Sequence, residues 1–167
     1  YILGAVRTPI GKRGGALSGI RPDTMAAHCL NGLTARAEID PGHVEDVIMG
    51  CVTQVDEQGM NVGRLAVLAA GWPVSVPSTT GNRMCASSLQ ATNFAAQAVM
   101  AGTMDLAVGA GVESMSRVTM GRDVGPINDL IADRFDIVSQ GVSAELIAEK
   151  YDISRESMDA LSLESHT

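Results

Sequence analysis

Residues 79–102 read TTGNRMCASSLQATNFAAQAVMAG and are almost free of charged residues. Arg83 is the only charged residue among them, and residues 84–104 contain no Asp, Glu, Lys, Arg or His. Such a run is long enough to suggest a membrane span, but it carries Ser, Thr, Asn and Gln among its many alanines. The pattern therefore predicts a helix buried between protein layers, with a lone cysteine, Cys85, at its front edge.

The composition narrows the class of protein. Of 167 residues, 46% are apolar and 19% charged, which is typical of a globular chain. The net charge of −7 argues against binding to nucleic acid or to an anionic membrane surface. The three cysteines, Cys29, Cys51 and Cys85, are widely spaced and form no CxxC pair, which argues against disulfides and a metal site. No signal peptide pattern opens the chain, so we expect a reducing, cytoplasmic compartment.

Apolar segments alternate with helical patterns along the first two thirds of the chain. We expect strands at 1–6, 44–52, 75–80 and 105–112, with helices at 23–39 and 61–70 and the Cys85 helix between them. Asp23 or Thr24 can cap the first helix. This alternation predicts an α/β fold in which a mostly parallel sheet carries helices on both faces.

After Glu113 the sequence becomes polar and is interrupted by Gly and Pro. We predict a domain boundary there, with one domain at 1–116 and the start of another at 117–167. Two helical patterns follow the boundary, capped by Ser143 and Ser154. The chain starts without Met and stops within a helical pattern, so we expect a fragment of a longer protein.

Several other motifs carry weaker signals. GAGVES lacks the third glycine of a dinucleotide fingerprint, so Gly109 and Gly111 are expected to allow close packing. The GKRGG segment at 11–15 resembles a phosphate-binding loop, but a solvated turn is favoured. For His28 and His43 a structural role is favoured over catalysis. Cys29 and Cys51 fall on apolar faces and are expected in the core.

Cys85 has a different position from the other two cysteines. A helix N-terminus carries about half a positive charge and unpaired N–H groups, which stabilise a thiolate. The same N–H groups can stabilise an oxyanion on a carbonyl that the sulfur attacks. Position alone leaves two alternatives open, a reactive nucleophile or an inert cysteine at a helix end.

The segment GNRMCASSLQA resembles the nucleophile motif of the thiolases, V-N-[RK]-x-C-[GA]-S-[GA]-x-Q-A. Four further segments are similar to thiolase motifs in order and spacing: AVRTPIGKRGG at 5–15, VIMGCVTQ at 47–54, GAGVESMSRV at 109–118 and QGVSAELIAEKYDISRESMDALSLESH at 140–166. The resemblance covers essentially the whole chain. It implies the N-terminal half of a five-layered αβαβα fold plus the start of an inserted loop domain, with the Cys85 helix between two sheets.

The resemblance also implies an acyltransferase, acting in a pathway such as fatty acid β-oxidation. Cys85 would attack the keto carbon of a 3-ketoacyl-CoA, release acetyl-CoA and pass the acyl group to CoA. CoA is then a substrate, and no further cofactor is expected. Thiolases complete the site with a histidine and a second cysteine from their C-terminal half. Neither Cys29, Cys51 nor any histidine here matches those motifs.

Two departures from the family pattern concern specificity. Ser88 replaces a common glycine and is small enough to fit. Ser139 and Gln140 stand where biosynthetic thiolases carry His-Met, at the acyl end of the substrate pocket. The change implies longer or bulkier acyl chains and slightly favours the degradative direction, although Gln140 could simply cap the helix expected from Ser143.

The resemblance further implies a homodimer or homotetramer that pairs through the strand within 77–84. Two alternatives to a thiolase remain. A ketoacyl synthase shares the fold and the helix-end cysteine, but its flanking motifs differ. A non-catalytic, thiolase-like lipid-binding or scaffold subunit would lack the catalytic residues of the C-terminal half.

Overall fold

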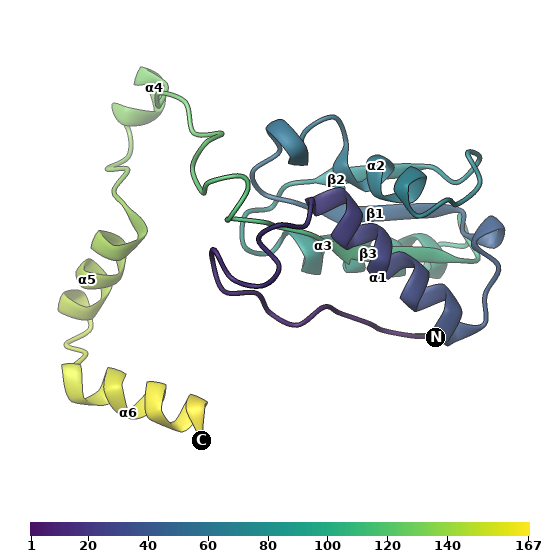
Figure 1. The fold of residues 1–167 in the computed structure, drawn as a ribbon. Coiled ribbons are helices and arrows are strands. Elements are labelled where there is room, and N and C mark those ends of the chain that lie inside the picture. Colours follow the sequence, from purple (N-terminus) through teal and green to yellow (C-terminus); the bar gives the residue numbers. More distant parts are fainter. The chain divides into compact units, whose positions relative to one another are not determined.

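A computed structural model describes all residues 1–167 and divides them into two compact units, 1–124 and 125–167 (Figure 1). The first unit holds α1 (Pro22–Ala37), β1 (Asp46–Gly50), α2 (Val62–Ala69), β2 (Ser78–Gly81), α3 (Ser87–Met100) and β3 (Ala107–Gly111). The second holds α4 (Asp129–Ala132), α5 (Gln140–Lys150) and α6 (Arg155–His166). The predicted boundary after residue 116 lies earlier in the chain than this division, and the loop-domain identity of the second unit stays a prediction.

The sheet of the first unit has three strands in the order β2-β1-β3. Both neighbours run parallel to β1, and Val47 pairs with Ser78 on one side and Val108 on the other. Parallel strands must be connected by crossovers, and helices supply them here. The predicted α/β class with a parallel sheet is confirmed.

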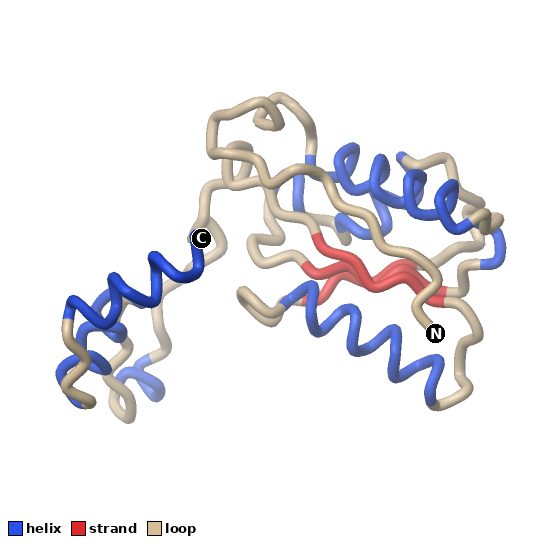
Figure 2. Tube along the Cα trace, turned by 90° about the horizontal axis from the view of Figure 1, so that it is seen from below, coloured by secondary structure: helices blue, strands red, loops and turns tan.

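Helices cover both faces of this sheet (Figure 2). On one face α3 packs on β1 and β3, and on the other α1 and α2 pack against each other, with α2 over β1 and β2. Side chains alternate between the two faces along β1. Val47 and Met49 lie in the larger core, whereas Ile48 packs on the other face against Ala91 and Ala95 of α3.

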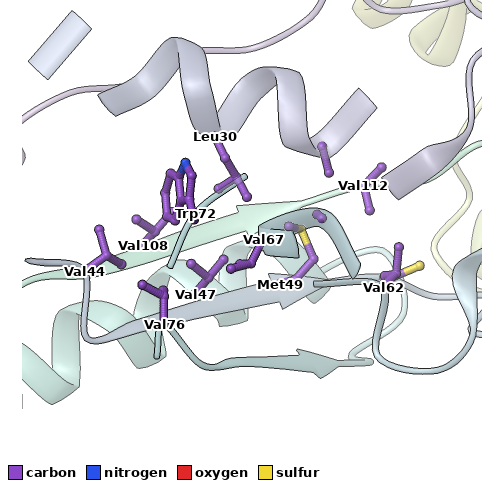
Figure 3. Close-up of a cluster of buried hydrophobic side chains, with 13 residues drawn as sticks. Leu30, Val44, Val47, Met49, Val62, Val67, Trp72, Val76, Val108 and Val112 are labelled. Carbon is purple, nitrogen blue, oxygen red and sulfur yellow. The ribbon is translucent and has the colours of Figure 1, made fainter. Parts of the chain in front are cut away.

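The larger core lies between the sheet and the pair α1 and α2 (Figure 3). Val47, Val62 and Val67 are fully buried, which contributes about 2 kcal/mol per side chain to folding. Leu30 reaches into the same cluster from α1. Cys51 is also part of it, so the prediction that Cys51 is a core residue is confirmed.

Glycines set the distance between α3 and the sheet. A Cβ added at Gly109 would lie 2.5 Å from the Cα of Thr92, and one at Gly50 would overlap the backbone of Ser87. A Cβ at Gly111 would likewise meet the Cβ of Ser88. These positions therefore require glycine for close packing, as predicted for Gly109 and Gly111, and Gly111 provides the space for Ser88.

The strand predicted at residues 1–6 does not form. The sheet consists of β2, β1 and β3 alone, and residues 1–6 contact α1 instead. The Arg36 guanidinium donates to the Ala5 carbonyl at 2.9 Å, and Gly4 lies against Leu33. Tyr1 and other apolar side chains of the segment remain exposed.

Helix starts differ from several predictions. The first helix begins at Pro22, because proline suits the first helical position, so its N-cap residue is Arg21 and neither Asp23 nor Thr24. The side chain of Asp23 pairs with Arg21 and accepts from the N–H of Thr24 at 2.8 Å. Likewise α5 begins at Gln140 and not at a Ser143 cap, so Ser139 is its N-cap residue.

The second unit contains one helix cap that was predicted and one helix that was not. The predicted cap at Ser154 is confirmed, because its hydroxyl accepts from the N–H of Ser157 at 3.2 Å. The four-residue helix α4 was not expected, since its segment shows no clear period.

We predict that Gly109→Ala lowers the free energy of unfolding by about 2 kcal/mol, because the added methyl group overlaps α3. Gly32→Ala, in an exposed turn of α1 where a Cβ meets nothing, is the control and should raise it by about 0.5 kcal/mol. Urea unfolding followed by circular dichroism measures both. Equal behaviour of the two variants would contradict the close contact between α3 and the sheet.

Candidate active site

Residues 82–86 connect β2 to α3 and include Cys85. The segment follows the carboxyl end of a parallel strand, where open α/β sheets place their ligand sites. Met84, directly before the cysteine, has a φ of 49°, in the left-handed region that non-glycine residues rarely adopt. Such a conformation persists only where surrounding interactions hold it, and it often marks a functional site.

Hydrogen bonds close this turn on both sides of the cysteine. The Asn82 side chain accepts from the N–H of Met84 at 2.8 Å and donates to the carbonyl of Val52 at 3.0 Å. The Ser87 hydroxyl accepts from the N–H of Arg83 at 2.9 Å and donates to the Met84 carbonyl. Cys85 is thus held between an asparagine turn and the first residue of α3.

The helix N-terminus offers free donors beside the cysteine. The backbone bonds of the turn are donated by Ala86 to Arg83 and by Ser87 to Met84, and none uses the N–H of Cys85. The N-cap residue of α3, Ala86, has no side chain that could cap the helix. Unpaired N–H groups at a helix start carry its positive partial charge, so the turn can stabilise a negative charge at or near the sulfur.

The predicted position of Cys85 at the front edge of the helix needs a small correction. The cysteine lies two residues before the first residue of α3, because the hydrogen-bonded turn must close before the helix begins. Its side chain is exposed. Within this chain α3 is buried on one side only, and Leu89 and Phe94 are exposed. Enclosure by a second half of the protein stays a prediction.

The other two cysteines have different environments. Cys51 is buried at the carboxyl end of β1, and burial together with the neighbouring Glu113 carboxylate raises the pKa of its thiol to about 12. Cys51 is therefore a protonated thiol at neutral pH. Cys29 lies half-buried on α1 and belongs to neither core cluster, so the prediction that it is a core residue is wrong.

A buried polar cluster, missed in the sequence, lies next to the turn. Glu113 follows β3, and its carboxylate accepts from the N–H of Val52 at 2.8 Å, from that of Thr53 at 3.3 Å and from the Gln58 amide at 2.8 Å. Gln58 is fully buried and also accepts from the N–H of Ser114 at 2.7 Å. The cluster fixes the loop after β1. The part of the sequence that could have indicated this cluster is the GAGVES motif, which contains Glu113.

Two cavities lie at this end of the sheet. The first, of about 60 Å³, lies beside the turn, and its lining includes Asn82, Arg83, Gln90 and Phe94. The second is an open groove of about 440 Å³ between residues 7–18 and 113–116. The GKRGG segment lines part of that groove as an exposed turn.

Ser139 and Gln140, predicted to bind the acyl group, lie at the start of α5 in the second unit. Both are exposed there, and neither side chain caps the helix. The idea that Gln140 caps a helix beginning at Ser143 is wrong, since Gln140 is itself the first helical residue. Cys85 belongs to the other unit, so a shared pocket stays a prediction.

No helix is both long and apolar enough to cross a membrane. No group of three or more His, Cys, Asp and Glu residues has the arrangement of a metal site.

Comparisons with known proteins agree with one another. The family model described as "Thiolase, N-terminal domain" matches residues 1–167. The chain is 46% identical to the steroid 3-ketoacyl-CoA thiolase of Mycobacterium tuberculosis, covering 99% of this chain and 44% of that protein. It is 42% identical to a beta-ketoadipyl-CoA thiolase of Escherichia coli, covering 99% and 46%.

A solved structure is similar to the chain in both fold and sequence. The crystal structure of an acetyl-CoA acetyltransferase from Bacillus anthracis superposes with a TM-score of 0.83 at 34% identity, covering 99% of this chain and 45% of that one. The chain therefore spans less than half the length of the relatives it matches.

We predict that iodoacetamide modifies Cys85 of the full-length protein first, then Cys29, and Cys51 last, at neutral pH. Cys85 is exposed beside free N–H groups, whereas Cys51 is buried with a raised pKa. Peptide mass spectrometry over a time course measures the order, and repeating it in denaturant should equalise the three rates. Equal rates in the native protein would contradict the placement of Cys85.

Proposed function

Since the chain belongs to the thiolase family, we propose that its full-length protein transfers an acyl group between a 3-ketoacyl-CoA and CoA through Cys85. The position of Cys85 is the observation that carries this proposal. It is exposed at the carboxyl end of a parallel sheet, in a turn held by hydrogen bonds, immediately before a helix with unused N–H groups. These are the groups that covalent acyl transfer requires on the nucleophile's side.

The proposed reaction has two balanced steps. In the first, the Cys85 thiolate bonds to the 3-keto carbon, and the carbonyl π electrons move to oxygen. Collapse of this oxyanion breaks the bond between C2 and C3 of the substrate, leaving an acyl thioester on Cys85 and the enolate of acetyl-CoA, which takes up a proton from an acid. In the second step, the CoA thiol gives its proton to a base, and its sulfur displaces Cys85 from the acyl group.

This chain supplies the nucleophile and a candidate oxyanion donor, the N–H of Cys85. Free N–H groups at the start of α3 stabilise the thiolate before attack and again when it leaves. A proton donor and a base from outside residues 1–167, as the family resemblance implies, complete the proposal. Coenzyme A is a substrate throughout, and no step requires a separate cofactor.

We propose that the acyl group is longer or bulkier than acetoacetyl. The names of two relatives refer to a steroid 3-ketoacyl-CoA and to beta-ketoadipyl-CoA. Ser139 and Gln140 also support a longer or bulkier acyl group, because the family resemblance implies that these two positions line the acyl end of the substrate pocket. Such a substrate slightly favours the degradative direction, as in β-oxidation. We place the enzyme in the cytoplasm as part of the same proposal.

The two alternatives make different predictions. A scaffold or lipid-binding subunit would bind acyl-CoA without turning it over, whereas a ketoacyl synthase would form a carbon–carbon bond and fail in thiolysis. Two relatives that match 99% of this chain are both named thiolases, and this favours a thiolase over the two alternatives.

We predict that the full-length protein is a dimer or a dimer of dimers. The strand β2 lies at the edge of the sheet, so its outer backbone groups can pair with a second copy in a two-fold contact. Analytical ultracentrifugation at micromolar concentration measures the assembly. A stable monomer under those conditions would rule the contact out.

We predict that Cys85→Ser lowers kcat for thiolysis by several orders of magnitude, about 5 kcal/mol or more in barrier, because serine forms an alkoxide far less readily than cysteine a thiolate. Loss of the 3-ketoacyl-CoA enolate absorbance follows the reaction. Cys29→Ser is the matched control and should keep wild-type activity. A Cys85→Ser enzyme with more than about a tenth of the activity, roughly 1.4 kcal/mol, would remove Cys85 from the nucleophile role.

A further inference from the structure

A continuous set of hydrogen bonds connects the end of β3 to the turn that carries Cys85. The Glu113 carboxylate holds the N–H of Val52 at 2.8 Å, and the carbonyl of that same residue accepts from the Asn82 amide at 3.0 Å. The other end of the Asn82 side chain accepts from the N–H of Met84 at 2.8 Å. Asn82 is therefore the only side chain that joins the turn to the loop after β1.

The conformation of the turn depends on this tether. Met84 has a φ of 49°, which costs free energy for a side chain with a Cβ and needs external support. The side-chain oxygen of Asn82 supplies that support by accepting from the Met84 N–H, while its amide nitrogen donates to Val52 and so ties the asparagine to the loop after β1. On the helix side, Ser87 is already held by its contacts with Arg83 and Met84.

The loop that receives the tether is itself rigid. Val52 is held by Glu113, which also binds the Thr53 N–H at 3.3 Å and the fully buried Gln58 at 2.8 Å. A buried network whose members are all paired has one well-defined geometry. The anchor for Asn82 therefore lies on a fixed part of the molecule.

We propose that Asn82 is a positioning residue for Cys85, because its amide fixes the turn to Val52 and so sets the cysteine against the free N–H groups at the start of α3. This role rests on the proposed function of Cys85 as the nucleophile. It adds a residue that acts through the cysteine and does not itself contact the substrate.

Asn31 provides a matched control. Its side chain also makes one bond of each kind, donating to the Ala70 carbonyl at 3.1 Å and accepting from the Trp72 indole at 2.8 Å. Both asparagines are exposed. The loop that Asn31 contacts leads into the amino end of β2, whereas Cys85 follows the carboxyl end, so the two sites lie at opposite ends of the sheet.

The experiment compares Asn82→Ala, Asn82→Asp and Asn31→Ala in the full-length enzyme. Asn82→Ala should lower kcat about 30-fold and leave KM within about threefold, since misplacement affects reaction more than binding. Asn31→Ala should keep wild-type kcat while lowering Tm by about as much as Asn82→Ala. Asn82→Asp keeps the acceptor for Met84 but loses the donor to Val52, so its kcat should fall between wild type and Asn82→Ala.

A second readout does not depend on turnover. Alkylation of Cys85 by iodoacetamide at neutral pH should be about tenfold slower in Asn82→Ala than in wild type, and unchanged in Asn31→Ala. Wild-type kcat and alkylation rates in Asn82→Ala, or equal losses in Asn82→Ala and Asn31→Ala, would overturn the positioning role. A wild-type enzyme without thiolysis would refute the proposed function instead, and the alkylation rates would still decide the role of Asn82.

Discussion

The close approach of α3 to β1 and β3 is the constraint on which the rest of the first unit depends. Three glycines in the two strands, Gly50, Gly109 and Gly111, leave the space into which the backbone and small side chains of α3 fit. Because the helix lies this close, the connection from β2 must turn sharply within a few residues. That requirement produces the left-handed Met84 and the hydrogen-bonded turn around it. Cys85 takes its position from this turn.

The same constraint explains the unusual sequence of residues 79–102. The inner face of α3 carries small side chains. Ser87, Ala91 and Ala95 are buried, and Ser88 and Thr92 lie over Gly111 and Gly109 of the sheet. Larger side chains such as Leu89 and Phe94 point outward from it and are exposed within this chain. The absence of charge on that outer face is consistent with the family's second layer, which would cover the helix in the complete protein.

The sequence predicted the layers of the first unit well and the details of its turns poorly. The apolar runs at 44–52 and 105–112 located β1 and β3, since a strand that is covered on both faces of a sheet consists mostly of apolar residues. The strand expected at 1–6 does not form because apolar composition does not distinguish a strand that joins a sheet from a segment that packs along a helix, as residues 4 and 5 do on α1. The start of α3 was placed too early because hydrogen bonds from Asn82 and Ser87 fix that start, and such side-chain bonds follow no period. Glu113 and Gln58 were not recognised as a cluster, because 55 residues separate them and only the fold brings them together.

The central claim is that the sulfur of Cys85 carries the acyl group. Its most direct test is to mix the full-length enzyme with a 3-ketoacyl-CoA in the absence of free CoA, quench in acid and map the modified peptide by tandem mass spectrometry. The account predicts an added mass equal to the acyl group on Cys85 alone, and its loss when CoA is added before quenching. An acyl group found on another residue, or none on a protein that still catalyses thiolysis, would contradict it.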